Sequence, residues 1–447
     1  MTKQTLLFLL FMLGLVACED DDSFTTSPSA RLSFSVDTLK MDTLFSSVPS
    51  TTYSFWVYNR GSDGLRLSNV RLAQGNQTGF RVNVDGSFLD NSLGSTVQGL
   101  EVRKGDSIRV FVELTAAENH QQEPVLLEDN LMFILESGVE QKVNLRAWAW
   151  DALRFDSIVV SRDSLICSDR PMVVYGDIRI DSAATLTLRN TTIYFHDKAG
   201  IHVYGTLKTD SVLMRGDRLD HMFDYLPYDR VSGQWRGIRI YSQSSGNQLV
   251  KTEIRNAEYG VVCDSAHYDS IKPRLTMDNC VVHNCKGPGI QSYNAYIQLN
   301  GSQLTNTLGD CLCVYGGLAV INACTLAQFY PFSANRGAAL RFGNKHENST
   351  YPLAGLVCLS SIVTGYEADV VMGEAGDTTA LFDYYFENSL LRTPSVNDTL
   401  RFKRILWETP KDSVQGKQHF VLIDEKNLKY DFHLDSISPA KGLGAYQ

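Results

Sequence analysis

The densest group of side chains that could do chemistry lies between residues 215 and 235, in the sequence RGDRLDHMFDYLPYDRVSGQW. Aromatic rings flanked by carboxylates and arginine suit sugars, because sugar C–H faces stack on aromatic rings while the hydroxyls form hydrogen bonds. The candidate ligand-binding residues are Asp220, His221, Asp224, Tyr225, Tyr228, Trp235 and Arg236. A segment of this length is too long for a turn, and long loops on a rigid scaffold are often functional. It therefore predicts a glycan-binding loop.

A second interpretation of this segment stays open, in which the loop packs over neighbouring strands and covers a sheet edge. Asp217, Asp220 and Asp224 could also hold calcium, but their spacing is not that of an EF-hand. We therefore predict no metal site and no cofactor, with calcium as a weak alternative.

A different chemistry is indicated at Cys18. Lys3 gives a short positive region and Leu6 to Val16 an apolar one, which is shorter than the roughly 20 residues of a membrane-spanning helix. Ala17 is small enough for a signal peptidase, and the Cys18 thiol is the available nucleophile for lipid transfer. The order Leu-Val-Ala-Cys resembles the lipobox of bacterial lipoproteins. The resemblance implies a signal peptide over residues 1–17, with acyl chains on Cys18 that insert into outer-membrane lipid.

Four carboxylates follow the expected anchor directly: Glu19, Asp20, Asp21 and Asp22. They resemble the acidic export signal of Gram-negative lipoproteins that are moved to the outer face of the outer membrane. The alternative is a solvated acidic linker, which blocks of like charge usually form. We expect residues 18–30 to be a tether, disordered over Ser23 to Ala30.

Composition excludes one class of partner. The formal net charge is −9, whereas phosphate binding needs a basic face, so nucleic acid is not expected. Nine cysteines are present, and no paired CxxC spacing indicates zinc. Apart from Cys18, we expect most of them to be small buried residues, with disulfides still open.

Residues 31–152 alternate in short apolar and polar runs, which predicts an antiparallel β-sandwich. The clearest predicted strands are Arg31–Val36, Tyr53–Tyr58, Ile108–Leu114 and Lys142–Ala147. The stretch from Trp56 through Asn59 and Gly61 to Val82 resembles one type of immunoglobulin-like domain. That resemblance implies a module that spaces or docks other domains.

Residues 153–447 contain a repeat, which predicts stacked coils. The segments LTMDNCVVHN, IQLNGSQLTN and AVINACTLAQ begin at Leu275, Ile297 and Ala319, at intervals of 22 residues. Each interval holds three short strands, as in a triangular coil. The pattern resembles the right-handed parallel β-helix of pectate lyase-like proteins, and we expect an all-β chain that ends in a C-terminal cap.

Further stretches resemble one family of surface β-helix lipoproteins, whose members mostly lack an assigned biochemical role. They are Tyr175–Leu186, Gly200–Leu207, Trp235–Ile240 and Tyr430–Leu434 with Ser438–Ala440. This resemblance implies the fold and the cellular address, and it implies no chemistry.

The repeat also predicts which residues stack. Asn256, Asn284 and Asn306 close their copies, so we expect their amides to form a ladder at one corner, each bonding the next. Cys280 and Cys324 should share an interior column two coils apart, about 9 to 10 Å, which is too far for a disulfide.

The third strand of each coil is where β-helix enzymes would place acidic catalytic residues. Its candidates here are Asp264, Gln291, Tyr293, Asp310 and Arg341. Only two are acidic, and about two coils separate them, so we predict no catalytic residues. The predicted function is non-catalytic binding or scaffolding at the cell surface, with a glycan preferred. A β-helix polysaccharide lyase or hydrolase is the alternative, and an adhesin or assembly protein with a protein partner is the third class.

Changing Cys18 tests the anchor. We expect Cys18→Ser to prevent acyl transfer, since the thiol is lost, and to leave the protein in the soluble fraction when lipid labelling and cell fractionation are measured. Cys167→Ser is the control and should keep both the label and the membrane location. A Cys18→Ser protein that still takes up a fatty-acid probe would refute the anchor.

Overall fold

The computed structural model describes residues 23–267 and 269–446, so the predicted signal peptide, Cys18 and Glu19 to Asp22 lie outside the described residues. The chain divides into two compact units, the first ending at Asp151 and the second spanning Ala152–Gln447. Both are built from strands, which confirms the all-β prediction. Within the described ranges, no helix is long and apolar enough to cross a membrane.

The first unit is a β-sandwich of two sheets, as predicted. One sheet has the order β1 (Ser33–Phe34), β3 (Tyr53–Tyr58), β9 (Ser107–Leu114), β5 (Phe80–Val84) and β6 (Ser87–Phe88). The other has the order β2 (Thr38–Phe45), β11 (Glu140–Trp150), β10 (Val125–Leu135), β4 (Leu65–Leu72) and β7 (Thr96–Val97), with β8 (Leu100–Val102) also on β4. Alternate residues of both sheets face one apolar core. The pairing is antiparallel except between β2 and β11, which run parallel.

The start of the described chain corrects the prediction of a disordered tether over Ser23 to Ala30. Phe24 forms a β-bridge with Gly64, and the amide of Thr25 donates to the Gly64 carbonyl at 3.0 Å. The Arg66 guanidinium lies 4.2 Å from the centre of the Phe24 ring. A Cβ on Gly64 would lie 2.7 Å from that ring, so glycine is what permits this close approach.

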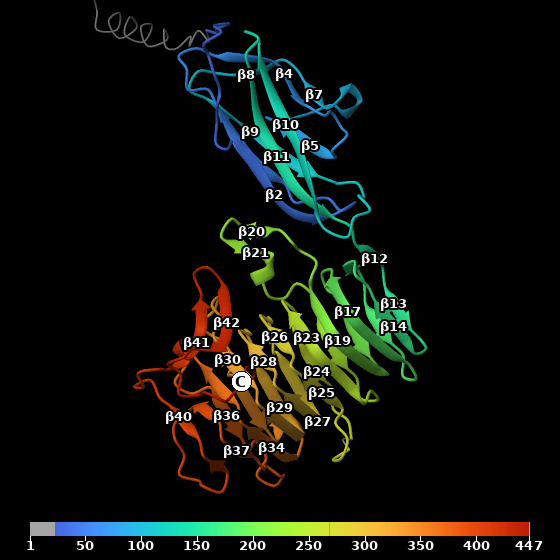
Figure 1. Cartoon of the computed structure of the whole chain (residues 1–447), viewed down its shortest axis with the longest axis vertical. Helices are drawn as coiled ribbons and strands as arrows, with labels where there is room; N and C mark the ends of the chain where they lie inside the picture. Colours follow the sequence, from blue (N-terminus) through green and yellow to red (C-terminus); the bar gives the residue numbers. More distant parts are fainter. Residues whose placement is uncertain (1–22, 268, 447) are drawn as a thin grey trace, which may run out of the picture. The chain divides into compact units, whose positions relative to one another are not determined.

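The second unit is a solenoid in which one continuous 25-stranded sheet winds through three faces (Figure 1). The first face contains β14 (Ser164–Cys167), β17 (Thr185–Phe195), β19 (Thr206–Gly216), β23 (Asn247–Arg255), β25 (Leu275–Asp278), β27 (Ile290–Asn300), β29 (Leu312–Asn322), β34 (Leu353–Leu359), β37 (Tyr385–Glu387) and β39 (Phe402–Lys403).

The second face contains β12 (Leu153–Phe155), β15 (Met172–Val174), the ends of β17, β19 and β23, then β26 (Val281–His283), β28 (Gln303–Thr305), β30 (Thr325–Gln328), β35 (Ile362–Gly365), β38 (Leu390–Arg392) and β40 (Leu406–Glu408). The third face contains β13 (Ile158–Val160), β16 (Ile178–Ile180), β18 (Gly200–Val203), β22 (Gly237–Ile240), β24 (Val261–Cys263), the starts of β27 and β29, then β31 (Leu340–Gly343) and β36 (Val371–Glu374).

The 22-residue interval sets the register. Leu275 pairs with Ile297, and Ile297 pairs with Ala319, so the predicted repeat is confirmed. The Cys280 amide donates to the Ser302 hydroxyl at 3.1 Å, which places these two residues in one interior column. Cys280 and Cys324 are both free thiols.

The described cysteines behave as buried apolar side chains, Cys167 excepted. Burial raises the pKa of seven thiols to about 12, so they stay protonated and unreactive at neutral pH. They are Cys263, Cys280, Cys285, Cys311, Cys313, Cys324 and Cys358.

A C-terminal segment packs onto the second face. It consists of a short helical turn, η3 (Gly416–His419), the hairpin β41 (Phe420–Asp424) and β42 (Lys429–Leu434), and the chain end. Phe420, Phe432 and Leu443 form a separate apolar cluster with Ile362 and other second-face residues. The last turns of the solenoid are therefore shielded from water on this side.

The asparagine ladder forms in part. Asn256, Asn284 and Asn306 all have positive φ, between 54° and 62°, which asparagine tolerates better than most residues. The Asn284 amide donates to the Asn256 side-chain oxygen at 3.0 Å. Asn306 departs from the prediction because its oxygen accepts from the Phe329 backbone amide at 3.2 Å, and its buried side-chain nitrogen has no hydrogen-bond partner.

Asn284→Ala tests the corner. We expect it to lower the unfolding free energy by about 1–2 kcal/mol, because it removes a buried hydrogen bond and disfavours positive φ. Lys251→Ala is a matched control, since Lys251 also has positive φ, at 45°, but is exposed. Chemical denaturation of both variants measures the effect, and equal midpoints would contradict a role for the Asn284 amide.

Candidate functional site

The 215–235 segment is a small projecting unit with the hairpin β20 (His221–Phe223) and β21 (Leu226–Pro227), followed by the helical turn η2 (Tyr228–Arg230). Its tip carries Phe223 and Tyr225, whose rings stack 5.6 Å apart at 11°. Tyr225 is 75% exposed, and His221 and Asp224 are exposed beside it. The structure therefore places these three predicted residues at one accessible tip.

Trp235 is not part of that tip, which corrects the prediction that it binds ligand. It is 1% exposed and stacks on Phe195 inside the solenoid, with ring centres 4.4 Å apart. Its indole nitrogen donates to the Arg255 carbonyl at 2.9 Å. The large ring fills the interior where the chain re-enters the coil, and Arg236 then follows half-buried at the start of the third face.

Arg218 contacts two other residues that were predicted to bind ligand, Asp220 and Tyr228. Its guanidinium lies 3.9 Å from the Tyr228 ring centre and pairs with both carboxylate oxygens of Asp220, at 2.7 and 2.5 Å. Asp217 instead pairs with His196 at 2.7 Å. These carboxylates therefore have different partners, Arg218 for Asp220 and His196 for Asp217. Across 23–267 and 269–446, no group of three or more His, Cys, Asp or Glu side chains could hold a metal ion.

The third face carries a column of tyrosines and carboxylates that stack rung on rung. Tyr204 and Tyr241 lie 4.1 Å apart at 12°, and Tyr293 and Tyr315 lie 5.7 Å apart at 17°. Asp264 sits at the equivalent position between the two pairs, since Cys263 pairs with both Ile240 and Ser292. We call this set, Tyr204, Tyr241, Asp264, Tyr293 and Tyr315, the tyrosine column.

The sequence had indicated Asp264 and Tyr293 but missed Tyr204, Tyr241 and Tyr315. Extending the register from Tyr293 by one 22-residue interval would have found Tyr315. The other two were hidden because the rungs on that side are longer, with the 215–235 segment inserted between them.

Arginines hold both predicted acidic residues of this face. Arg239 pairs with Asp264 at 3.0 Å, and Arg341 pairs with Asp310 at 2.8 Å. Hydrogen bonds to these carboxylates raise the pKa of both guanidinium groups. Asp310 also accepts the Ala338 backbone amide at 2.7 Å. Each carboxylate thus has structural partners already, and the two stand in separate ion pairs.

A cavity of about 660 Å³ opens at the end of the tyrosine column. Gly343 follows Tyr315 in the register and brings no side chain of its own onto the ring, while the His346 ring lies 4.4 Å from the Tyr315 ring. A Cβ on Gly343 would lie 3.6 Å from Tyr315, within the space that a ligand ring would occupy. Polar side chains surround this space: Arg341, Lys345, His346, Glu347, Asp369 and Glu374.

Three phenols of the column, those of Tyr241, Tyr293 and Tyr315, remain protonated at neutral pH. Burial raises the pKa of Tyr241 and of Tyr293 to about 12, and it raises that of Tyr315 as well. Their hydroxyls are therefore available as hydrogen-bond donors and acceptors.

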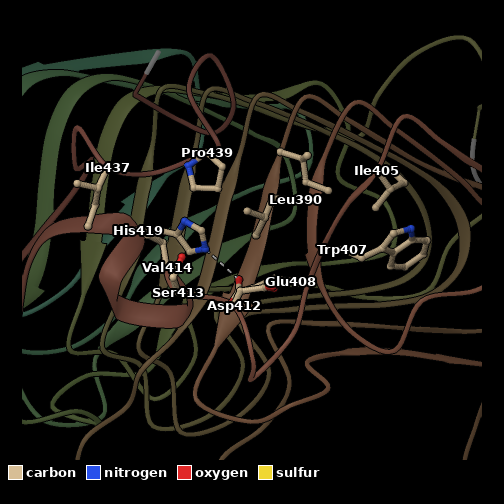
Figure 2. Close-up of a pocket in the computed structure, with 11 residues that line it drawn as sticks. Leu390, Ile405, Trp407, Glu408, Asp412, Ser413, Val414, His419, Ile437 and Pro439 are labelled. Atoms are coloured by element: carbon tan, nitrogen blue, oxygen red, sulfur yellow. Dashed lines mark ion pairs between the residues drawn. The ribbon is translucent and has the colours of Figure 1, made fainter.

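A second cavity, of about 510 Å³, lies at the C-terminal end of the solenoid. Figure 2 shows apolar side chains, among them Leu390, Trp407 and Ile437, around the paired Glu408 and His419. An acid beside a histidine could in principle transfer protons, so the partners of Glu408 decide its role.

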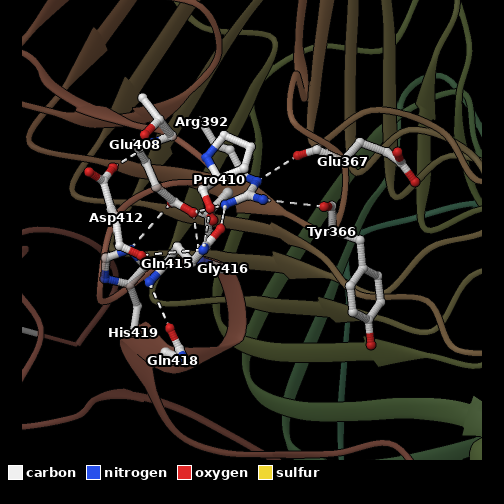
Figure 3. Close-up of polar contacts among 12 residues, drawn as sticks. Tyr366, Glu367, Arg392, Glu408, Pro410, Asp412, Gln415, Gly416, Gln418 and His419 are labelled. Atoms are coloured by element: carbon white, nitrogen blue, oxygen red, sulfur yellow. Dashed lines mark hydrogen bonds and ion pairs between the residues drawn. The ribbon is translucent and has the colours of Figure 1, made fainter.

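Both carboxylate oxygens of Glu408 are engaged by neighbouring groups (Figure 3). One oxygen receives Arg392 and the Gly416 backbone amide, and the other receives Thr364 at 2.7 Å and lies 3.3 Å from His419. Burial alone would raise the pKa of Glu408, but hydrogen bonds from His419, Thr364 and Gly416 outweigh it and lower that pKa. The group fastens the 412–420 segment to the last coil, and we assign it a structural role.

The comparisons with known proteins agree with this geometry. A family model described as a right-handed beta helix region matches residues 172–326. The solenoid is a right-handed β-helix. No curated protein matches the chain.

Two solved structures illustrate how weak the other similarities are. A protein of unknown function from Porphyromonas gingivalis W83 is similar at 12% identity and a TM-score of 0.20, over 28% of this chain and 48% of that one. The catalytic unit of a thermostable GH87 alpha-1,3-glucanase from Streptomyces thermodiastaticus strain HF3-3 is similar at 9% identity and a TM-score of 0.29, over 80% of this chain and 89% of that one. Both scores are too low to transfer a function.

The Glu408 cluster predicts a pH dependence. Because its folded pKa lies below the ordinary value of about 4.3, Glu408 stabilises the fold above that value, and this contribution is lost as pH falls through the folded pKa. We expect Glu408→Ala to cost about 3–5 kcal/mol, since Arg392 then stays buried without its carboxylate.

Denaturant unfolding at neutral and acid pH measures both effects. Asp412→Ala is the control, because Asp412 is an exposed carboxylate near the same cavity. A Glu408 variant as stable as the Asp412 variant would contradict the structural role.

Proposed function

We propose that the chain is a lipid-anchored, cell-surface protein that binds a glycan without cleaving it, through the third face of its solenoid. The observation that carries this proposal is the tyrosine column ending in the open cavity beside Gly343. A linear polysaccharide running along the solenoid axis would meet an equivalent position at every rung, about 4.8 Å apart.

The cavity beside Gly343 supplies both kinds of contact that sugars need. A sugar ring can contact Tyr315 on the side where Gly343 has no side chain. Arg341, Lys345 and Glu374 line the same cavity and can bond hydroxyls. The hairpin tip at Tyr225 is the competing location. Tyr225 is exposed, whereas Tyr228 is half-buried and Trp235 is buried.

Binding without cleavage is supported by the state of the two acidic residues that were predicted on the third face. A glycoside hydrolase uses two carboxylates that face one sugar bond, one of them donating a proton. Asp264 and Asp310 are instead engaged by Arg239 and Arg341. A β-helix lyase or hydrolase is the alternative function, and product formation distinguishes it from binding.

The cellular address rests on sequence. Cys18 would carry the acyl chains in the outer membrane, and Glu19 to Asp22 would direct the protein to the exterior. The sandwich, which we propose is immunoglobulin-like, lies between this anchor and the solenoid in the sequence and would act as a spacer. A protein partner that co-purifies in place of a glycan would favour the adhesin class.

Two variants test the binding face. We expect Tyr315→Ala to weaken binding several-fold, because a stacked aromatic contributes about 0.5–1.5 kcal/mol. Gly343→Val should weaken it as well, since its side chain fills the space beside Tyr315 while φ at this position is not positive. Binding is measured by titration against polysaccharides selected on a glycan array.

Tyr225→Ala serves as the matched control and should bind as the parent chain does. If it loses binding while Tyr315→Ala retains it, the site is the hairpin tip. New reducing ends or unsaturated products at enzyme-like rates would overturn the non-catalytic function.

A further inference from the structure

A third cavity, of about 360 Å³, lies where the hairpin β41–β42 covers the second face. Arg230, Arg255 and His283 line it from the solenoid side, and Tyr430 lines it from β42. The His283 ring lies 5.5 Å from the Tyr430 ring. This cavity is separate from the tyrosine column, which lies on another face.

A chain of hydrogen bonds leads from Tyr446 to the Nδ1 atom of His283. Tyr446 donates to the Gln303 side-chain oxygen at 2.8 Å, so the Gln303 amide nitrogen donates to the Thr305 hydroxyl, also at 2.8 Å. Thr305 lies 2.8 Å from His283 Nδ1 and, having accepted from Gln303, can donate its own proton there. Burial, with Arg230 and Arg255 nearby, lowers the pKa of His283 to about 3. When Thr305 donates to Nδ1, the neutral ring carries its proton on Nε2, as a donor.

Two further donors in this cavity lack partners. The Nε of Arg255 and the hydroxyl of Tyr430 are both buried without a hydrogen bond. The other Arg255 nitrogens lie 3.4 Å from Asp229 and 3.2 Å from Glu253, so only Nε is left over. Buried donors without acceptors are costly, so a bound acceptor would satisfy them.

Charged side chains of both signs surround this cavity. Arg215, Arg230 and Arg255 surround Asp229 at 2.7 to 3.4 Å, and Glu253 is the other carboxylate of the group. Asp431, which also lines the cavity, bonds His433 at 2.6 Å. Three guanidinium groups thus face three carboxylates, Asp229, Glu253 and Asp431, and Arg255 Nε remains without a hydrogen-bond partner among them.

We propose that this cavity binds a small oxyanion, a carboxylate, sulfate or phosphate group, held by Arg230, Arg255 Nε, His283 Nε2–H and the Tyr430 hydroxyl. Its volume is near the lower end for ligand sites and suits a free anion or one acidic sugar unit. The two buried groups that line the cavity without a hydrogen-bond partner, Arg255 Nε and the Tyr430 hydroxyl, can both donate, so the ligand must supply strong acceptors.

Titration of the purified full chain with sodium glucuronate, sulfate and phosphate tests the proposal, with glucose as the neutral comparison. We expect saturable binding of at least one anion and none of glucose. Tyr430→Phe removes only the hydroxyl and should weaken anion binding several-fold, and Arg230→Gln should weaken it about tenfold or more.

Two further variants serve as controls: Arg239→Gln lies outside the cavity, and Tyr446→Phe tests the hydrogen-bond chain to His283. Arg239→Gln lies on the third face and should leave anion affinity unchanged. Tyr446→Phe breaks the chain at Gln303 and should change the histidine NMR signal of His283, which the parent chain should show as the neutral Nε2–H form. Binding of none of the three anions, or a His283 proton on Nδ1, would overturn the proposal, and neither result bears on glycan binding by the tyrosine column.

Discussion

The backbone hydrogen bonds between successive coils are the constraint from which the rest of the structure follows. Each strand of the solenoid pairs in parallel with its equivalent one coil away, so its backbone groups are satisfied by neighbouring coils. A fixed register then places equivalent residues directly over one another. Residues one repeat apart therefore form columns. Cys280 and Ser302 stack inside the solenoid, and Tyr293 and Tyr315 stack outside it.

This constraint explains what the sequence could predict. The 22-residue interval at Leu275, Ile297 and Ala319 requires only that apolar residues recur, and such recurrence survives in a single sequence. The fold class and the separation of Cys280 from Cys324 both follow from it. The asparagine corner followed only in part, because the coil after Asn306 places Gln328 and Phe329 where another asparagine would be needed.

The candidate site was harder to predict because exposure depends on how an irregular segment folds back. Trp235 is a residue type that often contacts ligands, yet it lies two residues before β22 begins at Gly237, and its side chain is buried in the solenoid interior. Arg218 covers Tyr228 through a local contact that no periodicity reveals. Phe24 similarly joins the sandwich through a glycine, Gly64, that is distant in sequence.

Two faces of the solenoid thus have different roles in this account. The second face is covered by the C-terminal hairpin and fastened by Glu408, whereas the third face keeps an open cavity at the end of the tyrosine column. An open aromatic surface repeated along an axis is the arrangement that a linear glycan would use.

The most direct measurement is a crystal structure of the chain with a linear oligosaccharide that binds it. We expect sugar rings against Tyr315 in the space beside Gly343, extending along the solenoid axis toward Tyr241, with their glycosidic bonds intact. An oligosaccharide bound at Tyr225 with the third face empty, or one cleaved in the crystal, would contradict it.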